Sequence, residues 1–472
     1  MLVLAIESST SSAKATLFDT KEGIVSISEQ KYGRRVSANG KSYTKTVFNM
    51  TVQNAKKIAE GRDIAAIAIC GTWNSLAVCN SKMEPITQTF SWDFTETAAI
   101  CDDIKQNEPL TEQLYRNTGC LPSYAFPRHS IFYLKDQGFP LEDKKFITQG
   151  GYNFFRLTGE FLETICTHSG TGLINLHELD YDDFTLDFLG IRRDQLGELV
   201  TYRDTRPLSA EGAKLLGLKE GIPVVPAYPD GALNQLGDGA LIDGIMTMSV
   251  GTSGALRTVS KEPSLAEGRQ LWCYYGIDNW MIGAATNGAC NCIDWYIQNV
   301  MNDEKGYTAI ESEETPGKDV PVFLPFLFGE RCPGWKNNRI GGFMNVNNTH
   351  NRADLYKAIQ MGILFNLYQC YEIYCKAKTP PEQIILSGGI INSKIWTQMA
   401  ADIFKRDLIV SNTKNASSMG AVALALVAAG ELDSIHDFKV EHREENIVRT
   451  NTQQYQYYQR HYKRYLEAYS HS

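Results

Sequence analysis

Short apolar runs alternate along the chain with longer segments in which apolar side chains recur at helical spacing. The runs predict strands at 2–6, 14–18, 64–70, 222–227, 245–250, 280–284, 322–328 and 384–386. The longer segments predict helices at 146–159, 355–377 and 393–404, and a further helix that opens at 418. Buried strands that alternate with helices are typical of an α/β fold, so we expect strand-end loops that converge on a cleft.

Two of the predicted strand pairs are joined by turns rich in small and hydroxyl-bearing residues. The first turn covers 7–13, with Thr10 and Ser11 at its centre, and the second is Gly251-Thr252-Ser253-Gly254. Small residues let backbone N–H groups approach an anion closely, and hydroxyls add further donors. Each turn alone is equally compatible with an ordinary surface hairpin. Together they predict a phosphate-binding cleft.

An internal repeat relates these two turns. A shift of 242 positions places Ser9-Thr10-Ser11 on Gly251-Thr252-Ser253. Each of the two segments lies between an apolar strand and a second strand that carries a basic residue, Lys14 or Arg257. The match predicts two related domains that each offer a hairpin to a shared cleft.

One carboxylate stands between the two hairpins. The strand at 222–227 breaks at Tyr228-Pro229 and places Asp230 in a turn rich in glycine and alanine. Taken alone, Asp230 is equally compatible with a cap for the following helix. Near a phosphate-binding turn, a fixed carboxylate can accept the proton of an attacking hydroxyl, so Asp230 is a candidate general base.

The composition narrows the class of protein. A length of 472 residues predicts two or three domains, and 43% hydrophobic with 21% charged residues is typical of a globular protein. A formal charge of −8 argues against a surface for nucleic acid or anionic membrane. No apolar run is long enough for a membrane span, and the apolar start at 1–6 lacks a basic leader. We therefore expect a cytoplasmic protein.

Seven short motifs follow one another in a fixed order along nearly the whole chain. They are the hydroxyl-rich hairpin at 7–14, LTGE at 157–160, PDG at 229–231, GTSGALR at 251–257, LPFLFGERCP at 324–333, SGG at 387–389 and WTQMAADIF at 396–404. In this order they resemble the FGGY carbohydrate kinases. Within that family the chain most resembles the bacterial gluconokinases, notably at 251–257, 268–289 and 387–430.

The resemblance implies two actin-like domains of the ribonuclease H type, with ATP and sugar bound in the cleft between them. Residues 1–240 would form the sugar-facing domain and residues 241–472 the ATP-side domain. Asp230 would be the general base, and Glu7 would stand where the family has an aspartate that organises Mg²⁺. The resemblance also suggests a homodimer, since dimers are common in the family. The residues implied to contact ATP are Thr10, Ser11, Lys14, Gly251, Thr252 and Ser253 at the phosphates, and Gly388 and Gly389 under the nucleoside.

The departures from the family pattern fall mostly in the N-terminal half. Ser9 replaces the usual glycine of the first hairpin, and Trp73-Asn74 stands where sugar-binding relatives carry Met-His. Trp92-Asp93 belongs to a Trp-x-Asp-x-Arg motif whose carboxylate and arginine are out of register, with Arg128 and Arg331 as candidate replacements for the arginine. The residues expected to contact the sugar are Trp73, Asn74, Trp92 and Asp93.

These features predict an enzyme that uses ATP to phosphorylate a hydroxyl of a sugar or sugar acid, in the manner of a gluconokinase. A xylulokinase-like or polyol kinase is an alternative, because the arginine that would grip a carboxylate is out of place. A catalytically weakened relative that binds nucleotide or sugar is a second alternative. Ser9 favours that alternative, and the intact Asp230 opposes it.

Overall fold

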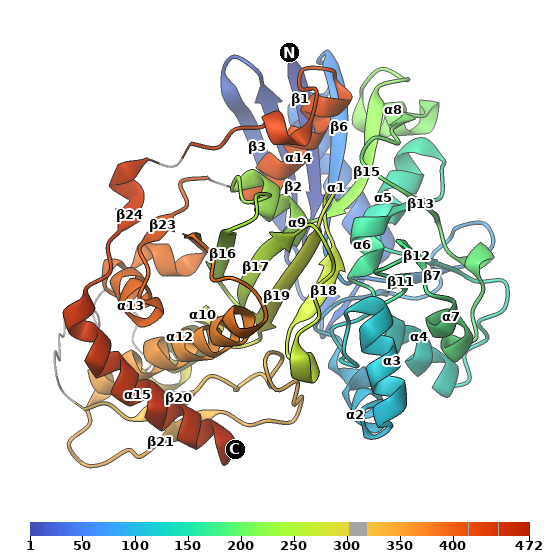
Figure 1. Cartoon of the computed structure of the whole chain (residues 1–472). Coiled ribbons are helices and arrows are strands. Elements are labelled where there is room, and N and C mark those ends of the chain that lie inside the picture. Colours follow the sequence, from blue (N-terminus) through green and yellow to red (C-terminus); the bar gives the residue numbers. More distant parts are fainter. Residues whose placement is uncertain (302–318, 414, 442) are drawn as a thin grey trace.

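Two large mixed sheets form the frame of the computed structural model, which describes residues 1–301, 319–413, 415–441 and 443–472 (Figure 1). The first contains β1 (Leu2–Ser8), β2 (Ser12–Asp19), β3 (Gly23–Lys31), β6 (Ile64–Gly71), β14 (Arg206–Pro207) and β15 (Pro223–Pro229). The second contains β16 (Ile245–Val250), β17 (Gly254–Ser260), β18 (Trp272–Tyr275), β19 (Trp280–Thr286), β22 (Gln383–Ser387), β23 (Leu408–Val410) and β24 (Ile447–Val448). The chain therefore has the predicted α/β fold.

The two sheets share one core arrangement. The strand order is β14-β15-β6-β1-β2-β3 in the first sheet and β18-β19-β17-β16-β22-β23-β24 in the second. In the first, β1, β2 and β3 are joined by antiparallel pairing, and β6 and β15 are added in parallel. In the second, β16, β17 and β19 are antiparallel, and β22 and β23 are added in parallel. The same pairing pattern thus occurs twice along the chain.

The strand register shows a difference between the two hairpins, although each second strand carries its predicted basic residue. Lys14 pairs with Glu7, near the end of the first hairpin, whereas Arg257 pairs with Thr247, farther from the turn of the second. The two basic residues are therefore not equivalent. Only Lys14 faces a carboxylate across its hairpin, so the two halves use their basic side chains differently.

Two helices cross between the sheets and join the halves of the chain. α9 (Asp230–Gly237) follows β15, and α14 (Ala416–Ala428) packs against α9 and against β1 and β6 (Figure 1). A Cβ atom on Gly420 would lie 2.1 Å from the carbonyl oxygen of Leu233, and one on Gly237 would lie 1.9 Å from that of Ala416. Glycine is therefore required on both helices at this crossing.

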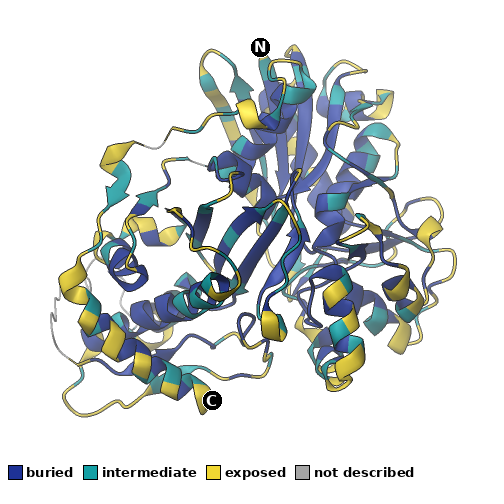
Figure 2. Cartoon of the chain, viewed as in Figure 1, coloured by how far each residue is buried: buried dark blue, intermediate teal, exposed yellow. Residues whose placement is uncertain are grey.

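Other helices cover the sheets. α1 (Thr44–Ala59) and α5 (Gln149–Thr158) pack against the first sheet, and α12 (Arg352–Ala377) packs against the second and against α13 (Lys394–Phe404). α15 (Thr452–Ser470) lies on α12 and α13, with one side open to solvent, while the central strands of both sheets are mostly buried (Figure 2). Within the described ranges, no helix is both long and apolar enough to cross a membrane.

One predicted helix begins later than expected. The apolar spacing predicts a start at Phe146, but α5 starts at Gln149. The preceding residues form β9 (Lys145–Ile147), which pairs with β7 (Ala77–Cys79). Thr148 then caps the helix, because its hydroxyl accepts a hydrogen bond from the N–H of Gly151. The apolar run predicted as one helix at 146–159 therefore contains the end of β9 as well as α5.

Candidate active site

A cavity of about 250 Å³ lies between the two halves of the chain. Its wall carries one carboxylate, two guanidinium groups and four large aromatic side chains. Six of the residues predicted for the site meet here: Thr10, Trp73, Asn74, Trp92, Asp230 and Ser253. The remaining lining residues are Thr72, Gly254, Ala255, Arg257, Trp272, Tyr274, Ala285 and Arg331.

Asp230 is the first residue of α9, and it lines the cavity. Its Oδ1 accepts hydrogen bonds from the backbone N–H groups of Trp73, at 3.3 Å, and Gly231, at 2.8 Å. Among the described residues, no donor is bonded to Oδ2, which leaves this oxygen available to a ligand. Burial raises the pKa of the Asp230 carboxyl, Arg257 opposes the rise, and the charge of Glu7 adds to it.

Three aromatic side chains, Trp73, Trp272 and Tyr274, form an aromatic wall on one side of the cavity. Trp272 and Tyr274 alternate along β18 and stack with 4.1 Å between ring centroids. Trp73 meets Tyr274 edge-on at 5.0 Å, and its indole N–H donates to the carbonyl of Cys166 at 3.3 Å. Asn74 beside it is buried and has a positive φ of 59°. A fixed aromatic surface of this kind suits the C–H face of a polyhydroxy ligand.

The two guanidinium groups come from different elements. Arg257 lies on β17, and Arg331 lies in the loop after β20 (Val322–Leu324). That loop is longer than predicted, because the strand expected at 322–328 ends at Leu324, where Pro325 has no N–H to continue the ladder. The guanidinium carbon of Arg331 lies 5.7 Å from the ring centroid of Trp92.

Arg128, the other candidate to replace the missing arginine, does not reach the cavity. Its side chain is fully buried, and it donates to the hydroxyl of Thr118 at 2.9 Å and to the carbonyl of Gly172 at 3.2 Å. A third bond goes to the carbonyl of Cys120. Arg128 is therefore committed to holding together the loops of the N-terminal half.

The first hairpin is closed by the hydroxyl of Ser9. Its Oγ accepts hydrogen bonds from the backbone N–H of Ser12 at 3.1 Å and of Ser11 at 3.4 Å, and it donates to the carbonyl of Ser12 at 3.0 Å. Two N–H groups that could contact a phosphate are thus bonded within the turn. Ser9 does not have a positive φ, so the backbone here does not require glycine.

Replacing Ser9 with glycine is expected to lower KM for ATP by about two- to tenfold, because the N–H groups of Ser11 and Ser12 are released for phosphate oxygens. Steady-state kinetics with varied ATP measures the change. Ser81→Gly, in an exposed turn, is the matched control for adding a glycine. An unchanged or higher KM in Ser9→Gly would mean that these N–H groups do not reach the nucleotide.

Glu7 is buried at the end of β1 and faces the start of α14. Its carboxylate accepts hydrogen bonds from the hydroxyls of Ser417, at 3.1 and 3.2 Å, and Ser418, at 2.9 Å. Lys14 lies 3.5 Å away on the neighbouring strand. Asn415, the N-cap residue of α14, gives no side-chain bond to the helix, so Glu7 supplies the negative charge at this helix start. The carboxylate therefore links the two halves of the chain.

The change Glu7→Gln is expected to lower the free energy of unfolding by about 1–3 kcal/mol, because Lys14 and the start of α14 lose their buried anion. Thermal unfolding of the ligand-free protein measures this loss, and Ser418→Ala should reproduce part of it. We expect the Mg²⁺ concentration for half-maximal rate to stay unchanged. A higher Mg²⁺ requirement without a loss of stability would instead assign Glu7 to the metal, as predicted from the sequence.

Several predicted site residues lie outside the cavity wall. Ser11, Lys14, Gly251 and Thr252 belong to the two hairpins but do not line the cavity, and neither do Gly388, Gly389 and Asp93. Gly388 follows β22 behind the second hairpin, where a Cβ atom would lie 2.4 Å from the carbonyl oxygen of Val250. Asp93 accepts a hydrogen bond from the hydroxyl of Ser91, which turns its carboxylate to its own loop. Their ligand contacts stay predictions.

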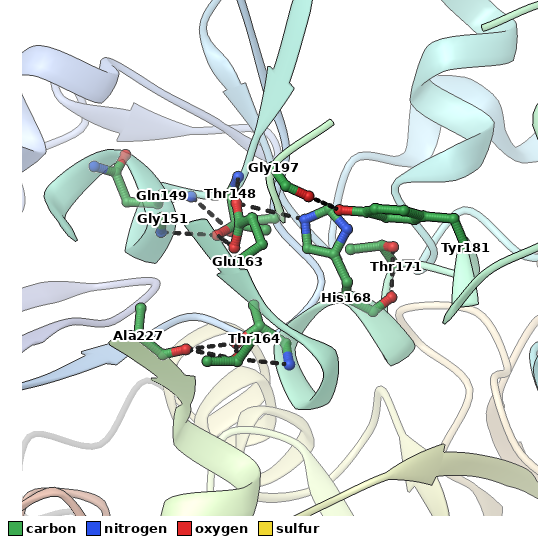
Figure 3. A network of polar contacts seen from close by, with 12 residues as sticks. Thr148, Gln149, Gly151, Glu163, Thr164, His168, Thr171, Tyr181, Gly197 and Ala227 are labelled. Atoms are coloured by element: carbon green, nitrogen blue, oxygen red, sulfur yellow. Dashed lines mark hydrogen bonds and ion pairs between the residues drawn. The ribbon is translucent and has the colours of Figure 1, made fainter. Parts of the chain in front are cut away.

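A buried polar network surrounds Glu163 and reaches β15 at Ala227 (Figure 3). Glu163 accepts hydrogen bonds from the N–H of Thr148 at 2.7 Å and its hydroxyl at 3.0 Å, and it lies 3.4 Å from His168. The hydroxyls of Thr164 and Thr167 both donate to the carbonyl of Ala227. Ala227 belongs to β15, which leads directly to Asp230. The network thus fixes the strand that positions the candidate base.

Among the charged and aromatic residues of the cavity wall, Arg257, Trp272 and Tyr274 were not predicted as ligand contacts from the sequence, whereas Arg331 was named as a candidate replacement for the arginine that is out of register. The sequence does contain a signal for Trp272 and Tyr274, because two large rings separated by one residue on a strand lie on the same face of the sheet. Arg257 was recognised only as the basic residue on the strand after the second hairpin. That Arg257 and Arg331 share one cavity depends on how β17 and the loop after β20 lie relative to each other, which the sequence does not specify.

Comparison with known proteins identifies the family. The N-terminal-domain model of the FGGY family of carbohydrate kinases matches residues 2–237, and the C-terminal-domain model matches residues 246–429. The chain belongs to the FGGY family of carbohydrate kinases. This membership confirms the predicted family and the predicted class of enzyme, a sugar kinase that uses ATP.

Relatives of this FGGY kinase include more than one sugar kinase. It is 28% identical to a gluconokinase of Bacillus subtilis (strain 168), over 92% of this chain and 88% of the relative. It is 25% identical to a xylulose kinase of the same organism, over 80% of this chain and 77% of the relative. The crystal structure of a gluconate kinase from Lactobacillus acidophilus has a TM-score of 0.92 and 25% identity, covering 99% of this chain and 98% of that one. The two-domain kinase fold is thereby confirmed.

Proposed function

We propose that this FGGY kinase transfers the terminal phosphoryl group of ATP to a hydroxyl group of a sugar acid of the gluconate type. One observation carries the proposal: Asp230 shares a single cavity with Thr10 of the first hairpin and Ser253 of the second. A carboxylate between two phosphate-binding turns can serve as the base for an attacking hydroxyl. Similarity to gluconokinases and the two cavity arginines, Arg257 and Arg331, favour a sugar acid over a neutral sugar.

In this proposal Asp230 is the general base. The backbone donors fix its Oδ1, so Oδ2 can accept the proton of the substrate hydroxyl as the oxygen attacks phosphorus. Burial raises the pKa of the carboxyl and makes it a stronger base, while Arg257 favours its ionised form. The aromatic wall orients the carbon chain of the substrate, and Thr10 and Ser253 line the side of the cavity where the phosphate groups of ATP would lie.

The proposal includes Mg²⁺, since a divalent cation neutralises the phosphate charge during phosphoryl transfer. The described part of the chain has no group of three or more His, Cys, Asp or Glu side chains that could hold a metal ion. Glu7 already accepts from Ser417 and Ser418 and faces Lys14, which does not fit an ion bound directly to its oxygens. We assign no protein ligand to the ion.

The proposal is tested by ADP release from Mg²⁺-ATP with D-gluconate, related sugar acids, ketopentoses, glycerol and hexitols as acceptors. We expect turnover with sugar acids above all. Turnover with a ketopentose alone would favour the xylulokinase-like alternative, as the similarity to xylulose kinases allows. No turnover with any acceptor, with ATP still bound in calorimetry, would identify a catalytically weakened relative.

Three further predictions from the sequence belong to this proposal. The domain boundary is placed between residues 240 and 241, in the segment that joins α9 to the second sheet. A cytoplasmic location accords with the use of ATP. A homodimer is proposed from its frequency in the family, and light scattering of the purified protein measures it.

A further inference from the structure

The loop between β20 and β21 (Gly342–Met344) contains a buried ion pair beside Arg331. Glu330 and Arg339 are 1% and 7% exposed, and a carboxylate oxygen of the first lies 3.2 Å from a guanidinium nitrogen of the second. The N–H of Gly334 donates to Oε1 of Glu330 at 3.0 Å, and a Cβ atom on Gly334 would lie 2.4 Å from Oε2. The carboxylate therefore fills the turn that contains Glu330, Arg331 and Gly334.

Backbone hydrogen bonds close this turn around Arg331. The N–H of Trp335 donates to the carbonyl of Arg331 at 2.6 Å, and the N–H of Glu330 donates to the carbonyl of Lys336 at 3.2 Å. Arg331 is 8% exposed and lines the cavity, where its guanidinium carbon lies 5.7 Å from the ring centroid of Trp92. Among the described residues its buried Nε has no hydrogen-bond acceptor. The position of this cation in the cavity therefore depends on the turn.

One side chain of α15 contacts both members of the ion pair. The hydroxyl of Tyr469 donates to Oε1 of Glu330 at 2.6 Å, and the guanidinium carbon of Arg339 lies 4.0 Å from the centroid of the Tyr469 ring. α15 also packs against β20, where the loop begins (Figure 1). Tyr469 does not line the cavity, so any effect that it has on the reaction passes through the loop.

The hydroxyl of Tyr469 is one of two hydrogen-bond donors to Oε1 of Glu330, and the N–H of Gly334 is the other. A hydrogen bond to a charged group stabilises more than one between neutral groups, and losing it leaves a buried charge with too few partners. Without the hydroxyl, we expect the carboxylate to shift toward Arg339. Gly334 and the backbone around Arg331 would then move with it.

We propose that Tyr469 is a positioning residue for phosphoryl transfer, because it holds, through Glu330, the turn that presents Arg331 to the cavity. The inference rests on the proposed function. It gives α15, a helix outside the cavity, a part in the activity of the site. It concerns where Arg331 lies, and it applies to either anion that this cation could meet, a phosphate of ATP or the carboxylate of a sugar acid.

The test is a double-mutant cycle on Tyr469 and Arg331. For Arg331→Gln we expect kcat/KM to fall about 10- to 100-fold, for ATP or for D-gluconate according to the anion that the arginine binds. For Tyr469→Phe we expect the same constant to fall about 3- to 10-fold. In the double variant, Tyr469→Phe should add little further loss, because no guanidinium is left to position.

Tyr465→Phe is the matched control. It removes a hydroxyl from the same helix, and among the described residues that hydroxyl has no hydrogen-bond partner. It should leave kcat/KM at the wild-type value. Tyr469→Phe is expected to lower Tm whether or not Arg331 is present, so only the coupling in kcat/KM reports positioning. Losses that multiply in the double variant, or an unchanged kcat/KM in either single variant, would overturn the inference.

Calorimetry separates failure of this inference from failure of the kinase proposal. The Kd values of ATP and D-gluconate are measured without turnover in the wild type and in the same variants. If no acceptor is phosphorylated but one of these Kd values shows the coupling between Tyr469 and Arg331, only the proposed kinase activity is overturned. If no acceptor is phosphorylated and neither Kd value shows the coupling, the inference is overturned as well.

Discussion

Asp230→Asn is expected to lower kcat for the sugar substrate by about 10²- to 10⁴-fold, with the Kd for ATP unchanged. The asparagine oxygen can still accept from the N–H groups of Trp73 and Gly231, so the start of α9 keeps its geometry. What is lost is the oxygen that takes the proton of the attacking hydroxyl. Single-turnover phosphorylation measures the chemical step, and calorimetry measures ATP binding.

The control for this variant is Asp63→Asn, which removes an exposed carboxylate that pairs with Lys219 on the surface. It should leave both kcat and ATP binding at the wild-type values. Full activity in Asp230→Asn would rule out the residue as the base. Loss of ATP binding in that variant would show that Asp230 holds the cleft together instead of reacting with the substrate.

The sequence predicted the features that depend on local pattern. Apolar runs located β1, β2, β6 and β15 of the first sheet and β16, β19 and β22 of the second, because buried strands in such folds are continuously apolar. The repeat of two hydroxyl-rich hairpins predicted a twofold arrangement, and both sheets have it. Asp230, Thr10 and Ser253 were selected from motifs, and they do share one cavity.

The features that escaped prediction depend on contacts across the chain. Glu7 meets Ser417 and Ser418 across more than four hundred positions, and no local pattern links these residues. Arg331 meets Trp92 from a distant loop, which hydrogen bonds of Cys332 to Ala285 on β19 and to Asn366 on α12 hold in place. The hydrogen bond from Ser91 to Asp93 also has no signal in the sequence, and the predicted contact of Asp93 with the sugar stays a prediction. Side-chain direction in loops is therefore where the sequence was least informative.

The contact that joins the two halves leads to the second large effect. Gly420→Ala is expected to lower the free energy of unfolding by about 1–3 kcal/mol or more, although alanine is favoured over glycine in a helix by about 1 kcal/mol. The added Cβ would lie 2.1 Å from the carbonyl oxygen of Leu233, a backbone atom that cannot move without shifting α9. The free-energy cost of overpacking is therefore expected to exceed the gain from the higher helix propensity of alanine. Denaturant unfolding measures the loss.

Activity should fall together with stability in Gly420→Ala, because α9 begins at Asp230 and any shift of this helix moves the base. Gly33→Ala is the matched control, since Gly33 has no heavy atom within 4 Å of an added Cβ and no positive φ. It should change neither property. A Gly420→Ala variant that lost stability but kept kcat would indicate that α14 moves at the crossing while α9 stays in place. The position of Asp230 would then not depend on the contact between the two halves.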